Sequence, residues 1–342
     1  MTAGITQMRR EILEIPAAVE RLLSRGGDAI AATVARARDI DPPFLLSVAR
    51  GSSDHACTYL KYASELLLRR PMASIGPSVV SQYGVELDVN GTMCISISQS
   101  GQSPDIVQMT KALRKNGAWT VAITNNPESC LACVVDRTLP MHAGPELSVA
   151  ATKTFVTSLV AGLWLIAELK GQSSLLAAIR ALPDRLEDAI DCDWSHAEDA
   201  IDGRSLLTLG RGPSRAISDE AALKFKETCL IHAESYSSAE VLHGPVSIID
   251  HGFPVIAFAA GDAAEESVAE TADALAAKGA RVFVLSDRAR TATRLQHVRT
   301  GHWLTDPVAA IVSFYCMVEA LAVRRGIDPD SPRHLNKVTE TV

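Results

Sequence analysis

The sequence carries one alternating pattern of apolar strands and amphipathic helices twice, and this duplication limits the possible folds more than any other feature. Three segments of the first half recur in the second half, at spacings of 161, 161 and 162 residues: 44–54 with 205–215, 91–100 with 252–261, and 116–125 with 278–287. Three matches at nearly one spacing indicate two copies of one folding unit.

Within each copy, apolar runs of strand length alternate with helical stretches, which predicts a parallel sheet with helices on both faces. We therefore expect an α/β protein with two tandem units, each a flavodoxin-like three-layer arrangement. The expected parts are an N-terminal helical segment (1–42), the first unit (43–172), a helical linker (173–200), the second unit (201–328) and a C-terminal tail (329–342).

Composition narrows the class of protein. The net charge is −7 and no run of basic residues is interleaved with aromatic ones, so nucleic acid is not an expected partner. The N-terminus lacks the apolar region of a secretory signal, and the mainly apolar run 155–167 is shorter than the about 20 residues that span a bilayer. We expect a soluble, cytoplasmic protein without a membrane partner.

The seven cysteines fit a reducing compartment. They are odd in number and lie mostly in apolar segments, as reduced core thiols do. Cys130 and Cys133 form a C-x-x-C pair, but no second pair or histidine cluster lies near them in the sequence. We expect neither a metal nor a cofactor.

Two strand-to-helix loops of the first copy are rich in hydrogen-bond donors. The strand from Phe44 ends in Gly51, Ser52 and Ser53, and the strand 93–97 runs into the loop 98–103, which contains Ser98, Gln99, Ser100 and Ser103. Such loops before helix N-termini suit a phosphate group, although Ser103 as a simple helix cap in a polar loop remains an alternative. The second copy has Ala259-Ala260-Gly261-Asp262 instead, so we expect one phosphate site per chain.

The stretch 219–243 is the chemically richest part of the second copy. If its first half is helical, Glu220, Lys224 and Glu227 recur at i, i+4 and i+7 and share one face. An exposed helix with an ordinary Glu–Lys pair is the alternative reading. A Ser-rich, turn-prone segment ending at His243 follows directly.

Six motifs in order then resemble the sugar isomerase (SIS) domain family, in particular the isomerase half of glucosamine-6-phosphate synthase and stand-alone deaminases of that type. They are RGSS at 50–53, SQSGQSPD at 98–105, ELSVAATKTF at 146–155, EAALKFKE at 220–227, HAESYSSAEVLHGP at 232–245 and PRHLNK at 332–337. Together they extend over essentially the whole chain.

The resemblance implies a role for each matching residue. It implies a phosphate and sugar site formed by Gly51, Ser52, Ser53, Ser98, Gln99, Ser100, Ser103, Val149 and Ala151. Relatives often have Ser where Ala151 stands, so only a backbone contact is expected there. It implies Glu227 as the base that moves a proton between C1 and C2, with Lys224 and Glu220 as its helical neighbours. His243 matches a residue that assists ring opening and comes from a neighbouring subunit in relatives, and Lys337 matches a lysine that forms an imine with a keto sugar phosphate.

These residue types suit an aldose–ketose interconversion, which needs a carboxylate near C1 and C2 and a donor or cation for the enediol-like intermediate. The full synthase begins with a glutaminase domain whose nucleophile is a cysteine after the initiator methionine, whereas this chain has Thr2. We therefore expect ammonia release: an amino sugar phosphate deaminase/isomerase that converts glucosamine-6-phosphate into fructose-6-phosphate and ammonia, working as a homodimer.

Three alternatives stay open from the sequence. The first is a deaminase or deglycase whose substrate is galactosamine-6-phosphate or a fructosamine phosphate. The second is a phosphosugar isomerase that releases no ammonia. The third is a non-catalytic sugar phosphate sensor, because the fold also serves regulators. Sensors usually add a DNA-binding or partner domain, and residues 1–42 contain no such pattern.

Overall fold

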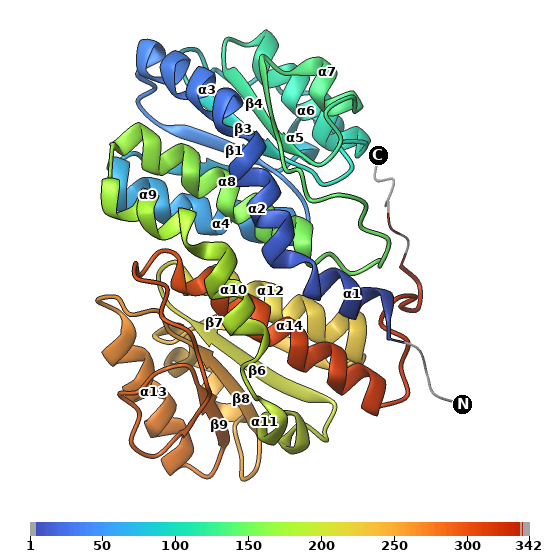
Figure 1. The fold of residues 1–342 in the computed structure, drawn as a ribbon, viewed down its shortest axis with the longest axis vertical. Coiled ribbons are helices and arrows are strands. Elements are labelled where there is room, and N and C mark those ends of the chain that lie inside the picture. The colour runs from blue at the N-terminus through green and yellow to red at the C-terminus, as the bar shows by residue number, and fades with distance from the viewer. Residues whose placement is uncertain (1–4, 336, 338–342) are drawn as a thin grey trace. The chain divides into compact units, whose positions relative to one another are not determined.

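The predicted α/β duplication is confirmed: the computed structural model, which describes residues 5–335 and 337, contains two five-stranded parallel sheets (Figure 1). The chain divides into two compact units, which we describe separately. The first unit comprises Ala17–Glu146, Lys153–Arg180 and Lys337, and the second comprises residues 5–16, Leu147–Thr152 and Ala181–Leu335. Residues 1–42, expected as one segment, thus contribute to both units.

The sheet of the first unit has the strand order β2-β1-β3-β4-β5. Its strands are β1 (Leu45–Val48), β2 (Met72–Ser74), β3 (Met93–Ile97), β4 (Trp119–Thr124) and β5 (Arg137–Pro140). The helices of this unit are α2 (Ile15–Arg25), α3 (Gly27–Ile40), α4 (Ser52–Ala63), the π-helical turn η1 (Ser64–Leu68), α5 (Ser78–Ser81), α6 (Pro104–Lys115), α7 (Cys130–Val134), α8 (Lys153–Lys170) and α9 (Ser173–Arg180).

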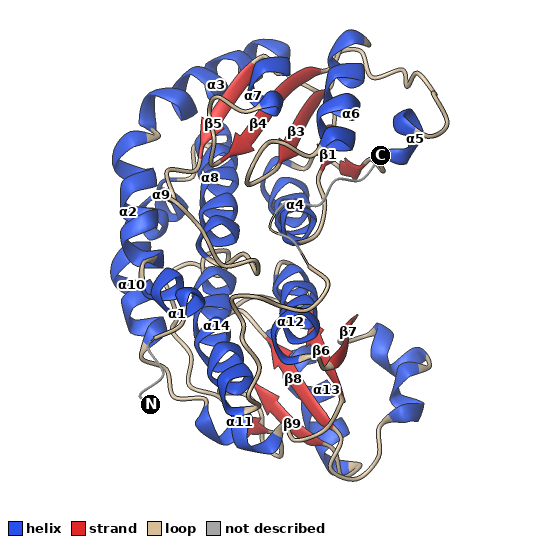
Figure 2. Ribbon diagram, turned by 90° about the vertical axis from the view of Figure 1, so that its right-hand side faces the viewer, coloured by secondary structure: helices blue, strands red, loops and turns tan. Residues whose placement is uncertain are grey.

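Helices cover both faces of this sheet (Figure 2). α8 packs against α3 and α4 on one face, while α6 packs with α5 and α7 on the other. Gly162 allows α8 to approach α4 closely, because a Cβ there would lie 2.3 Å from Leu60 Cδ1. The strands β1, β3 and β4 are buried nearly throughout, which explains their continuous apolar sequence.

The sheet of the second unit has the order β10-β9-β8-β6-β7, which is the same topology when β6 to β10 are matched to β1 to β5. Its strands are β6 (Ser205–Gly210), β7 (His232–Ser237), β8 (Pro254–Phe258), β9 (Arg281–Val284) and β10 (Thr293–Arg294). Its helices are α1 (Gln7–Leu13), α10 (Leu182–Ile190), α11 (Ser195–Ala200), α12 (Ser214–Cys229), the 3₁₀ turns η2 (Glu240–His243) and η3 (Pro245–Ile248), α13 (Glu265–Ala277) and α14 (Asp306–Arg324).

α14 is the central helix on one face of this second sheet, where it contacts α1, α10, α11 and α12. It is the one helix among the described residues whose length and mean hydropathy of 1.6 would suit a membrane span, yet 83% of that window is buried inside the protein. Its apolar surface is therefore used in the core. α1 is attached at its N-terminus, where the backbone N–H groups of Gln7 and Met8 donate to the carboxylate of Asp330 at 2.6 and 2.7 Å.

Candidate functional site

In the first unit, the predicted phosphate loops lie at the point where the strand order reverses. The chain leaves β1 to form β2 on one side of it, and β3, on the other side of β1, is followed by β4 and β5. The loops after β1 and β3 therefore diverge at the carboxyl edge of the sheet, which is where open α/β sheets bind ligands. The position of these loops agrees with a binding role.

The turn after β1 leads directly into a helix N-terminus. Gly51 has a φ of 54°, a left-handed conformation that favours glycine. Ser52 and Ser53 are the first residues of α4 and are partly exposed. Their position at the start of a helix makes backbone N–H groups available to an anion, because the first N–H groups of a helix have no carbonyl partner within it.

The loop after β3 folds back on its own hydroxyl groups. The N–H of Gly101 donates to Ser98 Oγ at 3.2 Å, and the N–H of Gln102 donates to Ser100 Oγ at 3.2 Å. Gly101 has a φ of 63°, and a Cβ there would lie 2.1 Å from Ser129 Oγ, so only glycine fits. These bonds hold the loop in a tight turn.

Ser98 is almost buried, whereas Gln99, Ser100 and Ser103 are partly exposed. Ser103 occupies the N-cap of α6 with an extended backbone, but its side chain makes no capping hydrogen bond. Its hydroxyl is thus not used by the helix, and the alternative of a simple helix cap loses its main support.

Sequence reasoning missed a charged group at these loops. Arg50 follows β1, and its Nε and Nη2 each lie 2.9 Å from Oδ2 of Asp105 in the first turn of α6. The Arg50 side chain is 52% exposed and that of Asp105 only 1%. The signal available was the arginine of the RGSS motif itself.

In the second unit, the predicted charged face of α12 is buried instead of solvated. Lys224 Nζ lies 3.1 Å from Glu220 Oε1 and 2.7 Å from Glu227 Oε2. The side chains of Glu220 and Lys224 are 0% and 1% exposed, and that of Glu227 is 20% exposed. Tyr315 of α14 donates a hydrogen bond from its hydroxyl to Glu220 Oε1 at 3.1 Å. The alternative reading of this segment as an exposed helix with an ordinary Glu–Lys pair is therefore wrong.

The electrostatics of this triad keep the lysine charged. Burial by itself lowers the pKa of Lys224, but the carboxylates of Glu220 and Glu227 outweigh burial and raise the pKa above the ordinary lysine value. Burying such groups is costly unless each finds its partner, which is why the three occur together. Glu227 is the most accessible of the three side chains.

The segment 147–152, which carries Val149 and Ala151, also belongs to the second unit, and both residues are partly exposed. The carboxylate of Glu11 in α1 accepts hydrogen bonds from the backbone N–H groups of Leu147 and Ser148. Glu11 is 1% exposed and lies on the buried face of α1 between Met8 and Ile12. Sequence reasoning missed this residue, although an acid on an apolar helix face was a signal.

His243 is exposed at the end of η2 in the second unit. Lys337 is half-buried in the first unit, where its Nζ lies 3.1 Å from Oε2 of Glu146. Glu146 is buried, and it also accepts hydrogen bonds from the N–H and the hydroxyl of Thr154 at 3.1 and 2.6 Å. Lys337 is thus held by a buried carboxylate and is not a freely solvated terminal lysine.

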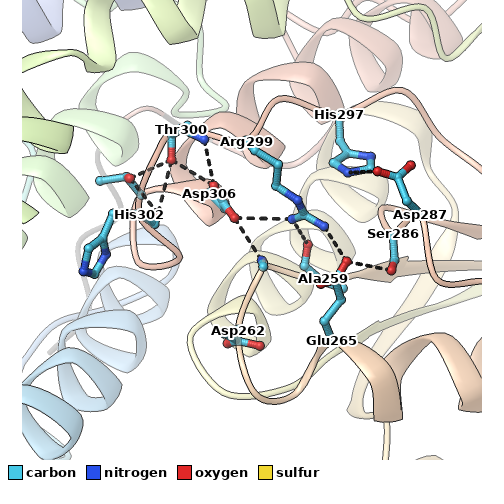
Figure 3. A network of polar contacts seen from close by, with 12 residues as sticks. Ala259, Asp262, Glu265, Ser286, Asp287, His297, Arg299, Thr300, His302 and Asp306 are labelled. Atoms are coloured by element: carbon cyan, nitrogen blue, oxygen red, sulfur yellow. Dashed lines mark hydrogen bonds and ion pairs between the residues drawn. The ribbon is translucent and has the colours of Figure 1, made fainter.

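The second-unit counterpart of the phosphate loop is filled by the protein itself (Figure 3). The N–H of Gly261 donates to Oδ2 of Asp306 at 2.9 Å, and Arg299 Nη1 lies 3.3 Å from the same oxygen. Arg299 Nη2 is also 2.6 Å from Glu265 Oε1. A carboxylate of the chain therefore occupies the position that would face an anion in this copy.

Metal sites and reactive thiols each require a particular arrangement of side chains. Within the part of the chain that the structure describes, no group of three or more His, Cys, Asp or Glu side chains is arranged to hold a metal ion. All seven cysteines are free thiols, and Cys130 and Cys133 are exposed. Burial raises the pKa of Cys94 to about 12 and that of Cys316 to about 11, so these two thiols stay protonated at neutral pH.

Comparisons with known proteins agree with this arrangement. The SIS domain family model matches residues 44–168 and again 201–324. The glutamine–fructose-6-phosphate aminotransferase (isomerizing) of Thermococcus kodakarensis is 32% identical over 346 residues, which cover 96% of this chain and 57% of that protein. The chain spans about half the length of the curated relatives it matches.

Two solved structures are similar over nearly the full chain. A protein of Silicibacter pomeroyi DSS-3, provisionally assigned as a phosphosugar isomerase, is 60% identical with a TM-score of 0.93, covering 95% of this chain and 100% of that one. The C-terminal domain of a glucosamine-fructose-6-phosphate aminotransferase from Francisella tularensis is 25% identical with a TM-score of 0.85, covering 97% and 100%. The duplicated sheets and both family matches lead to one conclusion: the chain belongs to the SIS domain family and contains two tandem copies of the domain.

Proposed function

We propose that this protein is a phosphosugar isomerase that acts on amino sugar phosphates and releases ammonia, converting glucosamine-6-phosphate and water into fructose-6-phosphate and ammonia. The observation that carries the proposal is the buried Glu220–Lys224–Glu227 triad, in which one carboxylate is partly exposed. The provisional assignment of the 60% identical Silicibacter pomeroyi protein supports the phosphosugar class. The fructose-6-phosphate named for the curated relatives supports the hexose phosphate substrate.

Glu227 performs the proton transfer in this proposal. On the open-chain aldose, its carboxylate removes the proton from C2 and returns a proton to C1, which leaves an iminium group at C2. Lys224 is 1% exposed, so we assign it to hold Glu227 in place, while Glu220 holds Lys224. A charged lysine close to the base also offsets negative charge that develops on the substrate.

The nitrogen leaves as ammonia in the second half of the reaction. Water adds to the C2 iminium and ammonia departs, or the amine of Lys337 adds in its place and the resulting imine is hydrolysed afterwards. Either route consumes one water and releases one ammonia. We assign Glu146, 3.1 Å from Lys337 Nζ, to accept a proton from this amine. Mass action favours release wherever free ammonia is scarce.

Phosphate recognition is assigned to the first unit and the acid–base groups to the second. Ser52, Ser53, Ser98, Gln99, Ser100 and Ser103 supply hydroxyl, amide and backbone donors for the phosphate. Val149 and Ala151 supply backbone contacts to the sugar. His243, exposed on η2, assists ring opening, and we propose that it does so in a homodimer, where it serves the neighbouring subunit.

The test is a substrate screen with the purified protein and no added cofactor. Glucosamine-6-phosphate is expected to yield ammonia and fructose-6-phosphate in equal amounts, and galactosamine-6-phosphate serves as the epimer control. A product that retains its nitrogen indicates isomerisation without deamination, and ammonia from a fructosamine phosphate alone indicates a deglycase. Binding of these compounds with no turnover of any of them contradicts an enzyme and points to a sensor. A monomer with full activity contradicts the role of the dimer.

A further inference from the structure

We propose that Arg50 binds the phosphate group of the substrate and gives the site its preference for phosphorylated sugars. The inference deepens the proposed function, on which it rests for the phosphate loops of the first unit. The hydroxyl, amide and backbone donors assigned to the phosphate are all neutral, and Arg50 is not among them. It adds the one positive charge that the described contacts place at these two loops.

Arg50 stands between the two loops that the phosphate site requires. It lies one residue before Gly51, where the chain enters α4, and it pairs with Asp105, two residues after Ser103 in the first turn of α6. One side chain therefore connects the loop after β1 with the loop after β3 at the point where the strand order reverses. A ligand held by both loops meets the guanidinium group.

The geometry of the pair leaves part of the guanidinium for a ligand. Nε and Nη2 both approach the same oxygen, Oδ2 of Asp105, at 2.9 Å, and the side chain of Arg50 is 52% exposed. A guanidinium has five N–H donors, so a second edge remains beyond the one that faces the carboxylate. A planar fork of donors matches phosphate oxygens in a two-point contact.

Asp105 gives this arginine a fixed position. Its side chain is 1% exposed, so the carboxylate is held by the protein and fixes one edge of the guanidinium group before a ligand arrives. Pre-positioning reduces the conformational entropy that a long side chain loses on binding. The buried carboxylate also balances the arginine's charge while the site is empty.

The second copy offers the matched case. Arg211 lies 161 residues after Arg50, again directly before a left-handed glycine, Gly212. Its Nη1 donates to Ser267 Oγ at 3.3 Å, so its described partner on α13, the counterpart of α6, is a hydroxyl and not a carboxylate. The loop beside it has its Gly261 N–H bound to Asp306. An arginine in the same turn thus exists twice, but only Arg50 adjoins a loop with hydroxyl groups.

The experiment compares Arg50→Gln with Arg211→Gln, and adds Arg50→Lys and Asp105→Asn. Binding of inorganic phosphate is measured by calorimetry, and kcat and KM are measured with glucosamine-6-phosphate. Losing a charged hydrogen-bond partner predicts that Arg50→Gln weakens phosphate binding and raises KM by about 10- to 100-fold, with kcat within about threefold. Arg50→Lys keeps the positive charge but loses the planar guanidinium group, so its phosphate affinity and KM are expected to lie between those of the wild type and Arg50→Gln. Arg211→Gln is expected to match the wild type in both quantities.

Two readouts separate phosphate binding from a merely structural link between the loops. KM of the wild type is expected to fall as pH rises through about 6, where the phosphate gains its second charge, and this dependence is expected to flatten in Arg50→Gln. Asp105→Asn keeps an oxygen that can accept from Arg50 and removes the negative charge beside it, so phosphate is expected to bind at least as tightly as in the wild type. A structural link predicts instead that both variants weaken phosphate binding equally, and that result overturns the inference.

The outcomes also separate this inference from the proposed function. Phosphate binding that depends on Arg50 in a protein without turnover upholds the inference and contradicts the deaminase. Turnover of glucosamine-6-phosphate with unchanged KM and unchanged phosphate affinity in Arg50→Gln upholds the enzyme and overturns the inference. Equal effects of Arg50→Gln and Arg211→Gln likewise overturn it.

Discussion

The two copies of the domain share a strand order but differ at the carboxyl edge of their sheets. In the first copy, hydroxyl groups within the loop 98–103 accept hydrogen bonds from its backbone, as Ser98 Oγ does from Gly101 N–H. In the second copy, the N–H of Gly261 is bound to the carboxylate of Asp306, which Arg299 also contacts (Figure 3). The loop amide thus pairs with a hydroxyl of its own loop in the first copy and with a carboxylate from α14 in the second copy.

The segments that follow the first strand of each copy also differ, and here it is the second copy that carries the additional polar groups. Glu220, Lys224 and Glu227 form the ion triad of α12, whereas Tyr59, Ala63 and Leu66 stand 161 residues earlier. The first copy thus lacks carboxylate and amine side chains where the second has three. The two copies thus differ at both places in opposite senses, which predicts that matched substitutions in the two copies have unequal effects.

The largest expected effect is on proton transfer in the second copy. Glu227→Gln keeps the size of the side chain and an oxygen for Lys224 but removes the base, so kcat is expected to fall about 10²- to 10⁴-fold. The loss of solvent deuterium incorporation at C1 measures the same step directly. Leu66→Gln, at the corresponding and exposed position of the first copy, is the control and is expected to leave kcat unchanged. A Glu227→Gln variant with wild-type kcat contradicts the role of this residue.

The second effect concerns the carboxylate that fills the loop of the second copy. Asp306 accepts hydrogen bonds from Gly261 N–H and from both donors of Thr300, each at 2.9 Å, and pairs with Arg299. Asp306→Ala removes these partners from a site that is nearly buried, so the free energy of unfolding is expected to fall by about 3–5 kcal/mol. Chemical denaturation at neutral pH measures the loss.

The same variant can break the comparison between the copies. If the carboxylate stands where an anion would bind, inorganic phosphate is expected to restore part of the stability of Asp306→Ala, because a ligand that binds only the folded state stabilises it. Wild-type protein and Asp306→Asn are the references. Stabilisation by phosphate that is the same in Asp306→Ala and the wild type shows that the second loop retains no anion site.

The third effect tests the hydroxyls of the first loop. Ser100 accepts a bond from Gln102 N–H and is partly exposed, so Ser100→Ala is expected to raise KM for the sugar phosphate about 3- to 10-fold. Stability is expected to change by less than about 0.5 kcal/mol. Ser267→Ala, on the helix after the second loop, is the control with unchanged KM. Equal KM values for Ser100→Ala and the wild type argue against a phosphate contact.

The sequence was sufficient to predict the fold and the residues of the triad. The repeated segments reveal the duplicated sheet because strand and loop patterns survive in both copies, and the i, i+4, i+7 spacing places Glu220, Lys224 and Glu227 on one face by helix geometry alone. The spacing did not reveal that this face is buried. Burial depends on the packing of α12 against β6, β7 and α14, which a local pattern does not contain.

The missed contacts share one property: their two partners are far apart in the sequence. Arg50 and Asp105 are separated by 55 residues, Glu11 and Leu147 by 136, and Lys337 and Glu146 by 191. Only the fold brings each pair together, and only the burial of one partner distinguishes these pairs from solvated ones.

The smallest expected effect comes from Asp262, which stands where the first copy has Gly101. Burial, together with the nearby carboxylates of Glu265 and Asp306, raises the pKa of Asp262 above its ordinary value. The folded protein therefore binds this proton more tightly than the unfolded chain, and stability is lost as pH rises from the ordinary aspartate pKa through the raised one.

Asp262→Asn tests this contribution of the carboxylate to stability. The variant retains an oxygen for Ala264 N–H and removes the cost of burying a charged carboxylate, so it is expected to be slightly more stable than the wild type at pH 7. The two proteins are expected to converge in acid, below the ordinary aspartate pKa. Urea midpoints of both proteins between pH 3 and 7 measure the difference, with the exposed Asp202→Asn as the control. A difference that is independent of pH, or a loss of stability at pH 7, shows that Asp262 is a favourable part of the second loop and not a charge that excludes anions from it.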